Sequence, residues 1–314
     1  MASLAGLPPN EIPIPSAPRT RAAFAEWPTW MVWAGVHVGF AGLTWYWTAL
    51  PFWFVLPVFA YIHCLDSHLI HEVLHGHPTR SARVNRWLMA VNLAGWVPYE
   101  IYRDSHIAHH RTDHLTHPEK DSESYYMMDR DWRTVPTPIR WLLTANNSLI
   151  GRMLFGPIIA VPRFFLAELR RIASGDLRYL PAWGILIVND IALGYWTFGI
   201  CDIPVWQAAV AIYAGMGLST VRSFIEHRPA GDQDARTAII EGGPLMQLLF
   251  LNNCFHLVHH DQPDLPWYEI PSVYRADRDA WIARTGGHWF PGYWTVFKRF
   301  AFRPKDTPVF PTNI

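Results

Sequence analysis

Hydrophobic and polar positions alternate in long blocks along this chain of 314 residues. The first hydrophobic block, residues 27–65, contains no Asp, Glu, Lys or Arg. The second, residues 179–221, is interrupted only by Asp190 and Asp202. A bilayer core is crossed by about 20 apolar residues, so each block is too long for one span. Each block therefore predicts a helical hairpin that enters the membrane and returns to the same side.

The turns of these hairpins are predicted at residues 46–51 and 201–204, where proline and short polar residues interrupt the pattern. All 26 Lys and Arg residues lie outside residues 27–70 and 179–221. By the positive-inside rule, this distribution places both termini and the polar segments in the cytoplasm. We expect an all-α integral membrane protein with four transmembrane helices and a cytoplasmic helical cap.

A single domain is expected, because no linker divides the chain. Its predicted parts are a cytoplasmic arm (1–26), a first hairpin (27–71), a cytoplasmic and interfacial region (72–179), a second hairpin (180–226) and a cytoplasmic region (227–314). No cleavable signal is expected, since the first long apolar stretch begins too late. Within the third part, residues 141–166 carry Arg152 and Arg163, which favours an amphipathic helix lying on the membrane.

The histidines gather near the ends of the apolar blocks. Thirteen of the 16 lie within residues 68–117 and 227–260. His71 and His75 are four apart, so they share one helical face. Two later clusters have the pattern H-x-x-H-H, whose spacing predicts three imidazoles on one face of a helix. Those clusters are His106, His109 and His110, and His256, His259 and His260.

This concentration of imidazoles predicts a metal centre with nine ligands, the eight clustered histidines and His227, which follows the second hairpin. One metal ion takes about four to six ligands, so nine imidazoles indicate two ions. Cys64, Cys201 and Cys254 are far apart in sequence and support neither a disulfide framework nor a cysteine-bound iron–sulfur cluster. The formal net charge is zero, which gives no sign of a nucleic-acid partner.

Metal-bound histidines usually donate their second N–H to a carboxylate or a carbonyl. Polar residues within a few positions of the clusters are the candidates for this supporting role. For each one taken alone, a solvated surface charge or a satisfied core residue is the alternative. The candidates are Asp66, His68, Glu72, Asp104, Asp113, Glu226 and Asp261.

The order and spacing of the three clusters resemble those of the membrane-bound fatty acid desaturase and hydroxylase superfamily. The resemblance runs from about residue 60 to residue 270. Residues 252–260, Asn-Asn-Cys-Phe-His-Leu-Val-His-His, resemble the family's third histidine box and add Asn252 to the supporting residues. His227 stands where the family often has an extra ligand. The tracts 117–124 and 266–271 resemble those of bacterial members.

The resemblance implies a non-haem di-iron enzyme in which the nine histidines hold two iron ions (Fe2+/Fe3+) and O2 is the co-substrate. It also implies a lipid or acyl substrate from the bilayer, and electrons from a separate ferredoxin, rubredoxin or cytochrome b5-like donor with its reductase. A bacterial member would lie in the inner membrane. Fatty acid desaturation is the expected reaction. Hydroxylation by a monooxygenase acting on an alkane, lipid or carotenoid is the alternative, because both reactions begin with hydrogen abstraction.

Two other functional classes are compatible with parts of the sequence. His71-Glu72-Val73-Leu74-His75 satisfies H-E-x-x-H, the zinc metalloprotease signature in which Glu is the general base. An intramembrane protease of this kind would leave six clustered histidines unexplained. A metal transporter would place its ligands within the spans. There the chain offers only His37, His63 and Asp190, so lipid oxidation is the preferred interpretation.

Overall fold

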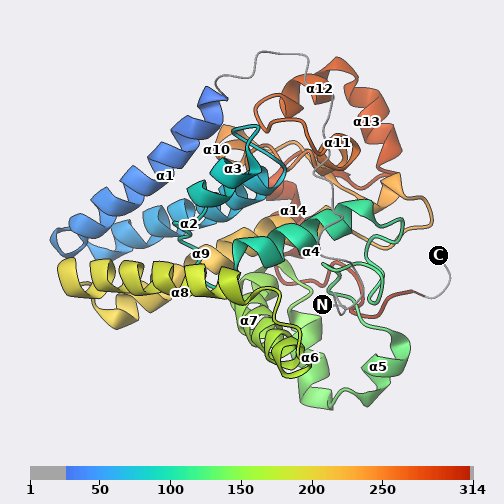
Figure 1. Cartoon of the computed structure of the whole chain (residues 1–314). Helices are drawn as coiled ribbons and strands as arrows, with labels where there is room; N and C mark the ends of the chain where they lie inside the picture. The colour runs from blue at the N-terminus through green and yellow to red at the C-terminus, as the bar shows by residue number, and fades with distance from the viewer. Residues whose placement is uncertain (1–25, 312–314) are drawn as a thin grey trace.

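The computed structural model describes residues 26–311, so the predicted N-terminal arm lies outside the described residues except for Glu26. These residues are mainly helical (Figure 1). The longer helices are α1 (Trp27–Trp45), α2 (Phe52–Leu74), α4 (Tyr99–Arg111), α7 (Leu149–Ala173), α8 (Leu180–Gly194) and α9 (Val205–Glu226). The shorter helices are α3 (Ala82–Leu88), α5 (Asp129–Thr134), α6 (Thr137–Ala145), α10 (Pro244–Leu249), α11 (His256–Asp261), α12 (Ile270–Ala276), α13 (Arg278–Arg284) and α14 (Tyr293–Phe300).

Two helical hairpins form the apolar part of the fold. A short 3-10 helix, η1 (Trp47–Ala49), joins α1 to α2, and the π-helical segment η2 (Tyr195–Ile200) continues α8 toward α9. In Figure 1, α1 runs beside α2, and α8 with η2 leads to the start of α9. Helix α2 packs against α1 and α9, and α9 also packs against α7. The centre of the bundle is therefore built by α2 and α9.

Glycines permit the close approach of these helices. A Cβ atom at Gly217 on α9 would lie 2.7 Å from the backbone oxygen of Met153 on α7. One at Gly215 would lie 2.7 Å from the ring of His63 on α2. Small residues at helix contacts are the usual device by which membrane helices approach closely. Helix α9 therefore packs closely against α2 and α7 at two glycines, which have no side chain.

The helices that qualify as membrane spans differ from the expected set. In the described part of the chain, length and composition select four helices: α2, α7, α8 with η2, and α9. Helix α1, in which four of the 19 residues are Trp, is not in that set. Helix α7, which we expected on the membrane surface, is included in it. The chain is a multi-pass membrane protein, and this set of spans differs from the expected set only in including α7 instead of α1.

Large apolar side chains on the outside of the bundle mark the surface that faces lipid. Ile187, Val188 and Ile191 on α8 are more than half exposed, as are Val205 and Trp206 on α9. Monomeric soluble proteins rarely leave such side chains in contiguous exposed patches. Because all backbone polar groups of a helix are paired internally, helices can present this face to hydrocarbon.

The polar end of the bundle is covered by the segments that follow α9. A parallel pair of short strands, β1 (Ile239–Ile240) and β2 (Trp289–Phe290), packs in a core with Phe224 and Ile225 from the end of α9. The N–H of Ile240 donates to the carbonyl of Cys254, and the N–H of Leu257 donates to that of Ala238. These bonds fix α11, which carries the third histidine cluster, against the end of α9.

Candidate metal centre

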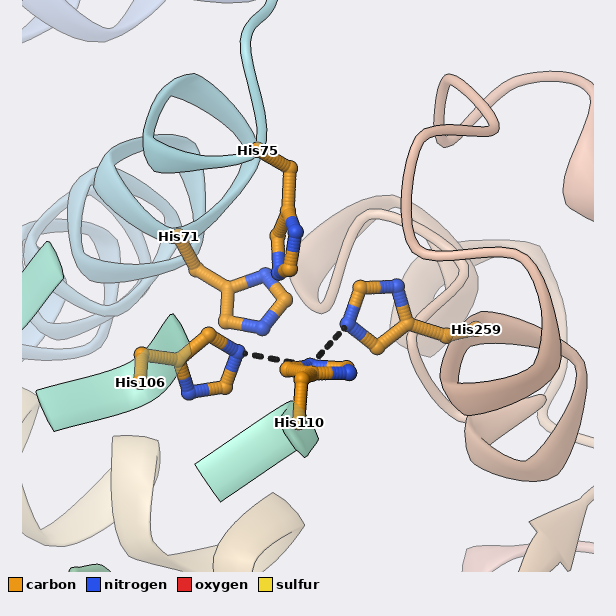
Figure 2. A group of neighbouring side chains, drawn as sticks. All are labelled: His71, His75, His106, His110 and His259. Carbon is orange, nitrogen blue, oxygen red and sulfur yellow. Dashed lines mark hydrogen bonds between the residues drawn. The ribbon is translucent and has the colours of Figure 1, made fainter. Parts of the chain in front are cut away.

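Five histidines from three helices form the first group of the site. Figure 2 shows their rings turned toward one another, with His71 and His75 from the end of α2, His106 and His110 from α4, and His259 from α11. Each offers a ring nitrogen, and these atoms lie within 4.8 Å of one another. The Nε2 atom of His110 is 3.0 Å from Nε2 of His106 and 3.1 Å from Nε2 of His259.

Four further histidines form the second group. His109 comes from α4, His227 follows α9 directly, and His256 and His260 lie on α11. Their ring nitrogens also lie within 4.8 Å of one another. The Nε2 atom of His227 is 3.1 Å from Nε2 of both His109 and His256. All nine histidines expected from the sequence are therefore gathered into a group of five and a group of four.

The structure divides each H-x-x-H-H cluster between the two groups, which corrects the expectation of one shared face. His109 and His110 are neighbours on α4 and point in directions about 100° apart, as a helix of 3.6 residues per turn requires. They therefore enter different groups. On α11, His259 enters the first group and His260 the second. The rings of His110 and His260 stack 4.1 Å apart, so the groups adjoin.

Acidic and amide side chains fix the orientation of three of these rings. The Nδ1 atom of His109 is 2.7 Å from the Asp121 carboxylate, and that of His106 is 3.0 Å from the Glu123 carboxylate. His256 Nδ1 is 2.8 Å from the Oδ1 atom of Asn253. A neutral imidazole carries one N–H, so donation from Nδ1 leaves a lone pair on Nε2. These lone pairs point into the two groups.

The residues present fit two metal ions. Among the nine histidines of the two groups, four buried ring nitrogens have no hydrogen-bond partner in the described part of the chain: His75 Nε2, His110 Nδ1, His227 Nδ1 and His260 Nε2. Two facing Nε2 atoms form a hydrogen bond only if one of them carries the proton, whereas unprotonated nitrogens that bind one ion at about 2.1 Å come to lie about 3 to 3.4 Å apart. The separations of 3.0–3.1 Å between Nε2 atoms match that requirement. Metal ions would take up the facing Nε2 lone pairs and the orphan Nε2 atoms of His75 and His260.

The electrostatics of the site favour neutral imidazoles, the form that binds metals. Burial lowers the pKa of His75, His259 and His260 well below the ordinary value. His109 differs: burial lowers its pKa, but nearby carboxylates outweigh burial and raise it above the ordinary value. Burial opposes ionisation of Glu123, yet the two histidines beside it lower its pKa to about 2. His75, His259 and His260 are thus neutral, and Glu123 is an ionised carboxylate of the same site.

A cavity of about 390 Å3 is lined by residues of α2, α4, α7 and α9. Its walls include the apolar residues Ala160 and Met216 and the charged residues Glu123, Arg152 and Glu226. A second cavity of about 150 Å3 shares those last three residues and is lined by histidines of both groups. The larger cavity therefore opens onto the metal-binding face of the site.

The sequence pattern of the fatty acid desaturase family matches residues 45–292. The chain belongs to the fatty acid desaturase family. It is 27% identical over 231 residues to the sphingolipid delta(4)-desaturase DES1 of Mus musculus, covering 70% of this chain and 65% of that protein. It is 25% identical over 240 residues to the sphingolipid delta(4)-desaturase/C4-monooxygenase DES2 of Homo sapiens, covering 74% and 66%. The alignment thus spans just under two thirds of the length of these curated relatives.

Among the supporting residues expected in this desaturase-family chain, only Glu226 contacts a ligand candidate, with Oε1 3.2 Å from His256 Nδ1. The others hold loops, helix ends and surface ion pairs. Asp66 accepts from the Leu93 N–H, His68 bonds the Cys64 carbonyl, Asp104 accepts from Tyr179, Asp113 is exposed, Asn252 donates to the Trp267 carbonyl and Asp261 pairs with Arg284. Proximity in sequence is therefore a poor guide to which carboxylate reaches a buried ring.

Sequence reasoning missed Asp121, Glu123 and Asn253 as hydrogen-bond partners of the histidines. Asp121 and Glu123 lie in the tract 117–124, whose acidic residues were part of the family resemblance. A loop turned by Thr116, whose φ is 72°, brings Asp121 back onto α4. Asn253 also lies 3.2 Å from a ring nitrogen of His71, so one amide links the first and third clusters. It precedes His256 by three positions, a spacing that could have marked it.

Glu72 has a structural environment that does not suit a metalloprotease base. Its Oε1 atom accepts a hydrogen bond from the N–H of Trp267 and lies 3.8 Å from His77. With Glu26 and His77, it forms a third polar group that contains neither His71 nor His75. A general base must be within reach of the water or proton on which it acts. The H-E-x-x-H match therefore arises from the desaturase-like first cluster, with Glu72 anchoring the loop at Trp267.

Proposed function

We propose that this chain is a membrane-bound, O2-dependent di-iron oxidoreductase that acts on a C–H bond of a fatty acyl or similar lipid, with desaturation as its main reaction. The observation that carries the proposal is the pair of adjoining histidine groups, five and four, at the end of an apolar cavity. Family membership supports the same chemistry. Imidazole ligands alone do not select iron over other metals, so the choice of iron rests on the family.

The nine histidines would hold the two irons, His71, His75, His106, His110 and His259 one of them, and His109, His227, His256 and His260 the other. When bound, the metal pair would supply the oxidising power that removes hydrogen from an unactivated C–H bond, with O2 as co-substrate. Asp121, Glu123 and Asn253 keep the rings oriented. The buried walls around them exclude water, which limits side reactions.

We further propose that α1, α2, α8 with η2, and α9 cross the membrane while α7 lies along its surface. Figure 1 looks nearly along α7 but across the other four helices, so α7 runs across their direction. The charged residues Arg163, Glu168 and Arg170 on α7 favour an interfacial position. By the positive-inside rule, the metal site and both termini would face the cytoplasm. For a bacterial chain, this membrane would be the inner one.

Electrons would come from a separate ferredoxin, rubredoxin or cytochrome b5-like donor with its reductase. The substrate would enter from the bilayer, because the cavity lies between helices that face lipid. Hydroxylation is the second candidate reaction, and one of the similar proteins is named both a desaturase and a C4-monooxygenase. Desaturation and hydroxylation differ in whether the substrate loses a second hydrogen or receives oxygen, which depends on positioning within about 1 Å.

The test is a reconstituted reaction with iron-loaded protein, a donor–reductase pair, O2 and a mixture of bacterial and sphingoid lipids. Mass spectrometry distinguishes a product lacking two hydrogens from one that has gained an oxygen atom. We expect products of the first kind, dependent on O2 and on the donor. A metal-loaded chain that oxidises no lipid, yet cleaves peptides, would contradict the proposal and favour the protease interpretation.

A further inference from the structure

Arg152, near the start of α7, is a buried cation whose hydrogen-bonding capacity is only partly used within the described part of the protein. Its side chain is 8% exposed, and its Nη2 atom has no hydrogen-bond partner there. Its Nε–H donates to the carbonyl of Asn146, and its guanidinium lies 4.1 Å from the centre of the Tyr125 ring. One edge of the guanidinium therefore remains available as a donor.

No carboxylate of the described residues forms an ion pair with Arg152. The charge of Asp306 acts on it from a distance, but the Asp306 carboxylate accepts hydrogen bonds from Asn147 and Tyr126. By contrast, Arg222, the other arginine that lines the large cavity, pairs with Glu226 at 2.9 Å. Burying a charge without a partner costs several kcal/mol. A ligand that brings an oxygen acceptor to Arg152 would offset that cost.

The position of Arg152 in the cavity sets the direction of a bound lipid. It lines both cavities, and the smaller one is also lined by His109 and His227 of the second group. Ala160, which also lines the larger cavity, is eight residues further along α7, or about 12 Å at 1.5 Å per residue. Arg152 therefore lies where the larger cavity meets the histidine-lined one, and Ala160 lies about two helical turns away on the same helix.

Hydroxyl groups complete the polar end of this cavity. Ser122 and Ser124 line it, and their Oγ–H groups donate to the carbonyls of Ser105 and Thr116. Their hydroxyl oxygens retain lone pairs that can accept a hydrogen bond from an N–H or O–H group of a ligand. A donor at Arg152 beside acceptors at two serines suits the polar end of an acyl lipid and gives no advantage to a plain hydrocarbon.

We propose that Arg152 binds a carbonyl or carboxylate oxygen of the lipid substrate, so that the chain is oxidised close to its polar end. This inference rests on the proposed lipid oxidation and narrows its substrate class to acyl lipids with such an oxygen near the reacting carbon. The chain extends from Arg152 along the cavity toward Ala160. Unsubstituted alkanes are accordingly poor ligands.

The binding test uses metal-loaded protein in detergent micelles and three molecules of equal chain length: octadecanoic acid, octadecanamide and octadecane. Radiolabelled octadecanoic acid serves as the direct ligand, and the other two compete with it. The wild type is expected to bind the acid and the amide more tightly than octadecane. A hydrogen bond to a charged group contributes 1.5–3 kcal/mol, so Arg152→Gln should weaken acid binding about 10- to 100-fold. Octadecane binding should change less than about twofold.

Two further variants separate recognition from damage. Arg163→Gln removes an exposed arginine from the same helix and should leave all three affinities unchanged. Arg152→Lys retains the charge and should recover part of the acid affinity. Equal binding of the acid by Arg152→Gln and wild type would overturn the proposal. So would a wild type that binds octadecane as tightly as the acid, a result that stands even if Arg152→Gln does not fold.

The position of the product bond gives a readout that separates this inference from the proposed function. If the wild type oxidises acyl lipids at a carbon within a few bonds of the carbonyl, both are supported. Oxidation deep in the chain would overturn the role of Arg152 and leave lipid oxidation intact. No oxidation of any lipid, with acid binding still dependent on Arg152, would refute the proposed reaction alone.

Discussion

Replacement of Asp121 by Asn should empty one metal site and spare the other. The Asp121 carboxylate lies 2.7 Å from His109 Nδ1 and accepts hydrogen bonds from the N–H groups of Thr116 and Glu123 at 2.7 and 2.9 Å. Asn has one acceptor oxygen and no charge, so it cannot replace all three bonds. Loss of such a partner to a metal-bound histidine typically costs 10- to 100-fold in metal affinity, or about 1.4–2.7 kcal/mol.

Because His109 belongs to the second group, Asp121→Asn should weaken the ion held by His109, His227, His256 and His260. The assay is iron per chain by elemental analysis after dialysis against graded chelator concentrations. The wild type should lose its two irons at higher chelator than the variant, which should pass through a state with about one iron. Glu123→Gln, acting through His106, should weaken the first group instead.

Asp113→Asn is the matched control, because Asp113 is an exposed carboxylate of the same loop. It should behave as the wild type at every chelator concentration. If Asp121→Asn lost both irons together, the two groups would form one cooperative unit, contrary to the division described above. If it lost neither, its carboxylate would not support His109.

Two predictions concern stability, each measured by thermal unfolding in detergent. Gly217→Ala places a methyl group 2.7 Å from the backbone oxygen of Met153 and should destabilise by about 1–3 kcal/mol, whereas Gly184→Ala, with open space around it, should be neutral or stabilising. Burial lowers the pKa of His288 to about 3 from 6.5, so the unfolded chain binds the extra proton between these pH values. The wild type should therefore lose about 1.4 kcal/mol of stability per pH unit through this residue as pH falls below 6.5. His288→Gln, which can still donate to the Ile225 carbonyl, should reduce that slope, and equal slopes would refute the assignment.

The histidine clusters could be predicted because the spacing of histidines within a helix determines which rings lie on the same side. His71 and His75, or His106 and His110, are one helical turn apart, and a turn brings both rings to one side. The division between two groups could not be predicted, because it depends on how α4 and α11 face each other. That packing is set by long-range contacts such as the bond from the Leu257 N–H to the Ala238 carbonyl.

The supporting carboxylates were harder to predict, because they come from a loop. Asp121 reaches His109 across 12 residues, through a backbone turn at Thr116 with positive φ. No periodicity specifies such a path, whereas Asp113 and Asp261, which are near the clusters in sequence, lie at the surface. The membrane spans were also hard to predict from the sequence. Helix α1, which is rich in Trp, is not selected as a span by length and composition, whereas α7 is selected although it contains arginines.

The most direct test of the central claim is the metal content of the wild-type protein, measured by elemental analysis after gentle purification in detergent. Two histidine groups that each hold an iron predict close to two irons per chain. The His110→Ala and His260→Ala variants, one from each group, should each contain fewer. A single zinc and no iron, persisting after expression in iron-supplemented medium, would contradict the account.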